Sequence, residues 1–231
     1  MEHGRLIVNL FKKYPLISFF LLSYLIMYSA AAIGIFGLID IPFIVLAIIG
    51  SFAPTIAAMI VLGSTEGKTG IVKLFSKFLV WNVGFSWFLA TISITIISSL
   101  VAIIYLLSQG MPIPEISFSG LWVLLMGAII LGPLSEEAGW SGYALAKLQI
   151  KYNALTSSLI LGSLWAAWHL PLWFIPGTTQ GTMNFGLFFV ALVAIRLIMG
   201  WAYNNTKGSL LISVLFHLFF NFGNELGVEV L

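Results

Sequence analysis

A small set of acidic, imidazole and amide side chains lies in segments that are otherwise almost free of charge. Its members are Glu136, Glu137, His169, His217 and Asn221. The two glutamates are adjacent, and Asn221 follows His217 by one helical turn. An ionised group at mid-bilayer costs roughly 2.5–3.5 kcal/mol on insertion scales. Carboxylates and imidazoles at such a depth are suited to acid–base catalysis or metal binding, so the function is expected here.

The composition places these residues in a membrane protein. Of 231 residues, 60% are hydrophobic and 8% are charged, whereas soluble domains carry about 25% charged residues. The net charge of +2 gives no sign of a nucleic-acid partner, and membrane lipid is the expected surrounding. There is no cysteine, which excludes disulfides, thiol catalysis and thiolate metal ligands.

Hydrophobic segments of bilayer length predict an all-α polytopic bundle with about seven transmembrane spans in a single domain, residues 1–231. The first segment is longer than the apolar region of a signal peptide and is expected to remain as a span. The predicted spans are residues 16–38, 41–62, 81–107, 121–147, 154–174, 185–203 and 209–223.

The charges between the spans predict the orientation. Lysine and arginine lie on one side of the seven-span arrangement, at Arg5, Lys12, Lys13, Lys68, Lys73, Lys77, Lys147, Lys151 and Lys207. The opposite side carries acidic residues alone, at Asp40, Glu115, Glu225 and Glu229. The positive-inside rule therefore predicts a cytoplasmic N-terminus and an external C-terminus. Residues 68–80 mix lysines with apolar residues, which is typical of an interfacial helix or of the start of span three.

The spacing of the polar residues restricts how they can meet. Neighbours on a helix point about 100° apart, so one glutamate can reach a cavity while the other supports a neighbouring helix. His217 and Asn221 share one helix face and can act on the same substrate atom. Taken singly, a histidine can simply bond a backbone carbonyl, and an asparagine can hold two helices together. As a set on three helices, they predict one pocket.

The same residues form three ordered motifs. Glu136-Glu137-Ala-Gly-Trp-Ser resembles the E-E-x-x-x-R motif of the CPBP (Abi, or CAAX-protease and bacteriocin-processing) intramembrane proteases. Trp165-Ala-Ala-Trp-His169 resembles their second motif, an aromatic residue four before a histidine. His217-Leu-Phe-Phe-Asn221 resembles their third, H-x-x-x-N. The resemblance covers residues 121–222.

The resemblance implies an intramembrane endopeptidase that acts on membrane-associated proteins or peptides in a multi-pass, bacterial cytoplasmic membrane setting. It implies that Glu136 activates water and that His169, His217 and Asn221 orient the water or stabilise the oxyanion, in peptide maturation or bacteriocin immunity. Two mechanisms stay open. Glu136, His169 and His217 are a plausible zinc triad. The metal-free glutamate mechanism is preferred, because one glutamate would otherwise serve as both ligand and base.

The sequence departs from the family pattern where the first motif has its arginine. Ser141 occupies that position, and Ala146-Lys147 replaces the usual Pro-Arg downstream. Arg196 is the only basic residue deep in a predicted span, and an intramembrane arginine normally pairs with a carboxylate. We therefore expect Arg196 within about 4 Å of Glu137. Without such a pair, the chain would be a weakened member that acts in binding or immunity.

Two other interpretations use the same residues. Gly139-Trp-Ser141-Gly142 matches the G-x-S-G motif of rhomboid proteases, which would make Ser141 and His217 a catalytic dyad. A transporter would use the polar groups as a pathway, but it predicts polar residues along several helices. Here they cluster on spans four, five and seven, which favours a site.

Overall fold

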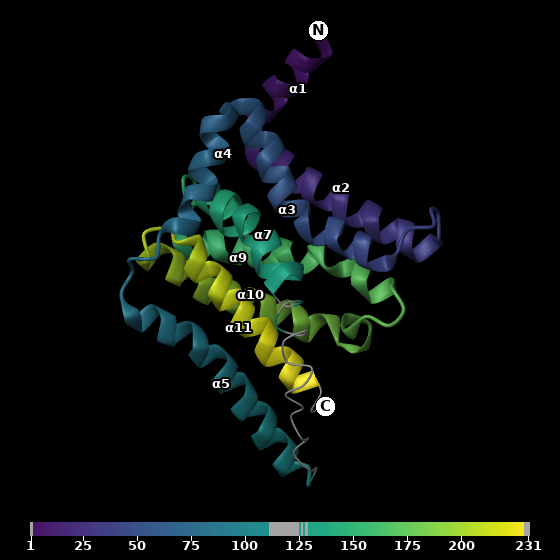
Figure 1. Cartoon of the computed structure of the whole chain (residues 1–231), viewed down its shortest axis with the longest axis vertical. Helices are drawn as coiled ribbons and strands as arrows, with labels where there is room; N and C mark the ends of the chain where they lie inside the picture. Colours follow the sequence, from purple (N-terminus) through teal and green to yellow (C-terminus); the bar gives the residue numbers. More distant parts are fainter. Residues whose placement is uncertain (1, 111–124, 126, 128, 229–231) are drawn as a thin grey trace.

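The computed structural model of the chain describes residues 2–110, 125, 127 and 129–228. Every regular element within these ranges is a helix, and they contain no strand. Figure 1 shows the helices gathered around α7 and α9, with α5 lying along α11 at one side of the bundle. The prediction of an all-α, polytopic helical bundle is confirmed.

Within the described ranges, four helices are long and apolar enough to cross a bilayer: α2 (Pro15–Phe36), α3 (Phe43–Thr65), α5 (Phe85–Ser108) and α10 (Phe185–Asn205). They correspond to predicted spans one, two, three and six. Helix α11 (Leu210–Val228) covers the seventh and runs beyond the predicted end. An α-helix pairs its backbone N–H and C=O groups within its own segment, as the hydrocarbon interior requires, although Pro54 inside α3 has no N–H to donate.

Short helices lie at the ends of these spans. Helix α1 (Glu2–Lys13), which the sequence analysis did not predict, has exposed apolar residues and ends on two lysines. Helix α4 (Gly67–Ser76) and the 3₁₀ turn η1 (Lys77–Leu79) confirm the helix expected at 68–80. Amphipathic helices of this kind lie in the membrane interface.

The fourth predicted span is broken within its described part. It consists of η2 (Ile130–Leu134), α7 (Ser135–Glu137), η3 (Ala138–Leu145) and α8 (Ala146–Leu148), where η2 and η3 are π-helical. The backbone leaves the helical conformation at Leu131 and Gly132, directly before Pro133. Proline lacks an N–H and its ring clashes with the preceding turn. The described part of span four is therefore a broken helix, and residues 111–124, 126 and 128 lie outside the described residues.

The fifth predicted span ends earlier than expected. Asn153 caps the N-terminus of helix α9 (Ala154–Trp168), and its side chain accepts a hydrogen bond from the Thr156 amide at 2.8 Å. The helix stops before His169 because Pro171 follows, and the chain continues as the 3₁₀ turns η4 (Leu170–Phe174) and η5 (Thr179–Thr182). The predicted end of the fifth span, residue 174, is thus corrected to residue 168 for the α-helix. The break places His169 at a helix end.

The connections that carry lysines meet on one side of the bundle. Lys77 Nζ donates to the Gly142 carbonyl at 3.0 Å and to the Tyr203 hydroxyl at 2.8 Å. Lys147 pairs with Glu66 at 3.3 Å, and Lys207 Nζ donates to the Asn82 carbonyl at 3.4 Å. The contacts agree with the predicted grouping of the basic connections. Of the acidic residues assigned to the opposite side, Glu115 and Glu229 lie outside the described residues.

Small residues allow the helices around the site to approach closely. A Cβ added to Gly139 would collide with the backbone of Pro54 in α3. One added to Gly162 would lie 2.9 Å from the Val193 Cα in α10. Helices in membranes often pack through small residues in this way, because backbones then make extensive van der Waals contact. The glutamate-bearing segment is consequently pressed against α3, and α9 against α10.

Candidate active site

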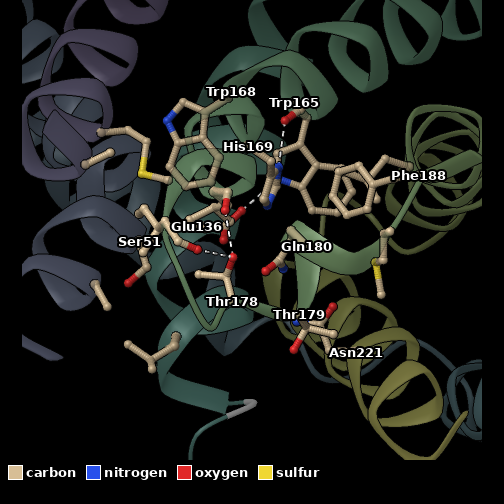
Figure 2. A pocket seen from close by; sticks show the side chains of 18 of the residues that line it. Ser51, Glu136, Trp165, Trp168, His169, Thr178, Thr179, Gln180, Phe188 and Asn221 are labelled. Atoms are coloured by element: carbon tan, nitrogen blue, oxygen red, sulfur yellow. Dashed lines mark hydrogen bonds between the residues drawn. The ribbon is translucent and has the colours of Figure 1, made fainter. Parts of the chain in front are cut away.

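Four of the five predicted site residues line one cavity of about 1050 Å³. Glu136 comes from α7, His169 from the end of α9, and His217 and Asn221 from α11. Figure 2 shows Glu136, His169 and Asn221 around this space. The expectation that three helices contribute polar groups to one pocket is confirmed.

Glu136 is the carboxylate that reaches the cavity. It is 4% exposed, and its Oε2 accepts hydrogen bonds from two indole nitrogens, Trp140 Nε1 at 3.0 Å and Trp165 Nε1 at 2.7 Å. No cation pairs with Glu136 among the residues that the structure describes. The two neutral donors hold the carboxylate in place without a paired cation that would weaken its attraction for a proton.

Glu137 is fully buried and faces away from the cavity. Arg196 binds it through two parallel bonds, from Nη1 to Oε2 at 3.0 Å and from Nη2 to Oε1 at 3.2 Å. The Ser141 hydroxyl also donates to Oε2, and His217 Nδ1 lies 2.9 Å from Oε1. The predicted Arg196–Glu137 pair is confirmed. Glu137, which was predicted to be catalytic, does not line the cavity and contacts His217 through Nδ1.

The hydrogen bonds fix which histidine nitrogens carry protons. His169 Nδ1 lies 2.8 Å from the Trp165 carbonyl, which cannot donate, so Nδ1 carries the hydrogen. For a neutral ring, Nε2 of His169 then has a free lone pair. His217 Nδ1 faces the carboxylate of Glu137 and likewise donates. Both rings therefore donate a hydrogen bond through Nδ1, and Nε2 is the ring nitrogen left to contact water or substrate.

Asn221 and His217 meet beside the helix break at Gly132. A Cβ added to Gly132 would lie 3.0 Å from Asn221 Nδ2 and 3.6 Å from His217 Nε2. Two side-chain nitrogens therefore face the same few ångströms of space. An amide N–H₂ in that position can donate to a developing oxyanion. The glycine leaves room that any other side chain would take.

Two contributors to this site were not predicted from the sequence. Trp140 was given no role within the first motif or the G-x-S-G match, yet its indole donates to Glu136. Gly132 lies in a Gly-Pro pair just before the glutamates, which is a signal for a break in a predicted helix. Ser141 is fully buried, binds Glu137, and does not line the cavity. Its position gives it a structural role and does not favour the rhomboid dyad.

The metal triad of the sequence analysis does not form a metal-binding group here. Among the described residues, no three histidine, aspartate or glutamate side chains are grouped closely enough to hold one ion. Oε2 of Glu136 is already bound by two N–H groups. Oε1 of Glu136 and the Nε2 atoms of both histidines are not used by these bonds. The choice between a zinc site and a metal-free glutamate mechanism therefore stays a prediction.

The rest of the cavity wall is largely apolar. One wall comes from α2 and α3 and includes Met27, Ala31 and Leu46. Opposite it, the loop between α9 and α10 contributes polar side chains such as Thr178 and Gln180. Such a cavity accommodates an apolar segment and offers hydrogen bonds at one side.

Two comparisons with known proteins agree with the motifs. Residues 118–223 match the family model described as type II CAAX prenyl endopeptidase Rce1-like. The protein named CAAX prenyl protease 2 from Methanococcus maripaludis is 27% identical over 234 aligned residues. That alignment covers 93% of this chain and 84% of the relative. The matched segment includes all five residues proposed from the sequence.

The buried ion pair gives the first prediction. Arg196→Ala leaves Glu137 charged and unpaired, and removal of one partner of a buried pair costs about 3–5 kcal/mol. Thermal unfolding in mild detergent is expected to show this loss. Arg196→Ala combined with Ser141→Arg is expected to recover part of it, because a residue at 141 lies one turn from Glu137.

The matched control is Lys147→Ala, which breaks the partly exposed pair with Glu66. Exposed pairs contribute about 0–1 kcal/mol, so this variant should unfold close to the wild type. Equal losses for Arg196→Ala and Lys147→Ala would contradict the special role of the buried pair.

Gly132 gives the second prediction. Gly132→Ala places a methyl group beside Asn221 Nδ2 and His217 Nε2. Removal of an oxyanion donor typically costs about 10²–10³ in kcat, and a displaced donor is expected to cost a measurable part of that. Peptidase assays and thermal unfolding should show lower kcat at nearly unchanged stability. Gly63→Ala in α3, where a Cβ meets only a side chain at 3.4 Å, is the control that should retain activity.

Proposed function

We propose that this chain, a member of the CPBP family of intramembrane proteases, is an endopeptidase in which Glu136 activates the attacking water. One observation carries the proposal: Glu136, His169, His217 and Asn221 line a single cavity inside a bundle of membrane helices. The comparisons support an intramembrane endopeptidase, and the residue roles below are our own assignment.

The first step is the activation of water. A water molecule between Glu136 and the Nε2 lone pair of His169 has two acceptors for its protons. Glu136 takes one proton as general base while the water oxygen attacks the carbonyl carbon of the substrate. The cavity walls limit the access of other water, so the attack is confined to the bound peptide.

The second step is the collapse of the tetrahedral intermediate. Asn221 Nδ2 donates to its oxyanion, and His217 adds an Nε2–H donor when both of its nitrogens carry protons. Glu136 then gives its proton to the leaving nitrogen as the C–N bond breaks, which yields an amine and a carboxylic acid; transfer of the acid's proton to the amine gives the carboxylate and the ammonium product.

The expected substrate is a membrane-associated polypeptide that places an apolar segment in the cavity. The descriptions of the two matches name CAAX prenyl substrates, so prenylated and unprenylated peptides are both suitable probes. A role in peptide maturation or bacteriocin immunity, and a bacterial cytoplasmic membrane, stay predictions. The Arg196–Glu137 pair supplies the charge that the first motif lacks, which supports an active enzyme over a weakened one.

The base assignment is tested with Glu136→Gln. This change keeps the shape of the side chain but removes the group that takes the proton, so hydrolysis of a membrane peptide library should fall by about 10²–10⁴-fold. Ser141→Ala should retain measurable hydrolysis, because Ser141 only supports Glu137. Full turnover by Glu136→Gln would exclude the assignment, and abolition by Ser141→Ala alone would favour the rhomboid mechanism.

The metal question is tested on active protein. The glutamate mechanism predicts that activity persists after treatment with a membrane-permeant chelator and that elemental analysis finds well under one zinc per chain. A metalloprotease would instead lose activity to the chelator and regain it when zinc is added. Loss of activity to the chelator, with recovery on zinc addition, would mean that Glu136 is a metal ligand and not a free general base.

A further inference from the structure

The two neighbouring glutamates are held by different kinds of donor. Glu137 is bound by a guanidinium, a hydroxyl and an imidazole. Glu136 is bound on Oε2 by two neutral indole N–H groups, from Trp140 at 3.0 Å and from Trp165 at 2.7 Å. A carboxylate oxygen has about two lone-pair directions, so these two donors fill Oε2. The oxygen left for a water molecule is Oε1.

Trp140 comes from the same segment as Glu136 and is fully buried. Its ring meets Phe19 of α2 edge-on at 5.5 Å and Trp168 of α9 edge-on at 5.7 Å, and it stacks on Phe20 at 6.2 Å. A ring packed on three sides cannot rotate without displacing its neighbours. The direction of its N–H is thereby fixed from α2 and α9.

Trp165 donates to Glu136 from α9 and also contacts Arg196 and both histidines of the site. The Arg196 guanidinium carbon lies 4.1 Å from the centre of its ring. The rings of His217 and His169 meet it edge-on at 5.0 Å and 5.5 Å. Its carbonyl also receives the His169 Nδ1 hydrogen bond. One indole thus sets the relative positions of the base and both histidines.

We propose that Trp140 and Trp165 are positioning residues that lock Oε2 of Glu136 and present Oε1 to the attacking water. The proposal rests on the proposed function. Neutral donors suit this task, because they fix the carboxylate while leaving it without a paired cation that would weaken it as a base. The two tryptophans also come from different elements, η3 and α9, so the orientation of the base depends on the packing of α9 against η3.

The kinetic test removes each N–H while keeping an aromatic ring. Trp140→Phe and Trp165→Phe are each expected to lower kcat by roughly 10-fold, as expected for loss of one hydrogen bond to a charged group. Trp140 does not line the cavity, so the KM of Trp140→Phe should stay near the wild-type value. The control is Trp173→Phe, which loses an indole bond to the Met183 carbonyl at 2.9 Å and should keep its kcat. An unchanged kcat in Trp140→Phe, or an effect on KM alone, would overturn the proposal.

A second measurement reports the contacts without activity. In protein labelled with ¹⁵N-tryptophan, the Trp140 and Trp165 indole signals are identified by their absence in the two Phe variants. Glu136→Ala should shift both signals and leave that of Trp173 in place. Unmoved Trp140 and Trp165 signals would also overturn the proposal. Because this readout needs no hydrolysis, an inactive wild type would refute the proposed function while the indole contacts are still tested.

Discussion

The buried pair of Arg196 and Glu137 is the interaction on which the site depends. Both side chains are fully buried, and a charge at that depth is stable only when it is paired and hydrogen-bonded. The pair joins α10 to the glutamate segment, and the second oxygen of Glu137 extends it to His217 on α11. The guanidinium also lies over Trp165 on α9. One ion pair therefore ties together α9, α10, α11 and the glutamate segment, so none of these elements can move without displacing the others.

The second constraint is the break at Gly132 and Pro133. In an unbroken helix, the glutamate segment would present its side chains in a regular spiral. The non-helical residues Leu131 and Gly132 interrupt that spiral directly before the glutamates. Irregular backbone is tolerated at membrane depth where it is buried in protein or lines a cavity. Here it does both, since Leu131 lines the cavity and Gly132 faces Asn221.

Much of this arrangement could be predicted from the sequence, because membrane insertion makes polar residues conspicuous. The cost of buried charge and helical spacing predict the cluster of polar residues, a cavity-facing glutamate beside a supporting one, and the partner of Arg196. The choice of Glu136 as the cavity-facing base comes from the resemblance to the intramembrane proteases. The helix ends at Leu131 and Trp168 could not be located this way, because hydropathy does not register a break inside an apolar segment. The indole bonds to Glu136 depend on ring orientations that only packing determines.

The adjacency of the two glutamates has a physical reason in this fold. A base in an apolar interior needs a fixed orientation, yet a cation bound directly to it would weaken its attraction for a proton. Placing the cation on the neighbouring residue separates these requirements, since successive helical side chains diverge by about 100°. Glu137 takes the arginine and orients His217, while Glu136 faces the cavity with neutral donors. The Arg196–Glu137 pair thus stabilises the cluster on the side away from the cavity, and the Glu136 carboxylate on the cavity side stays available to water.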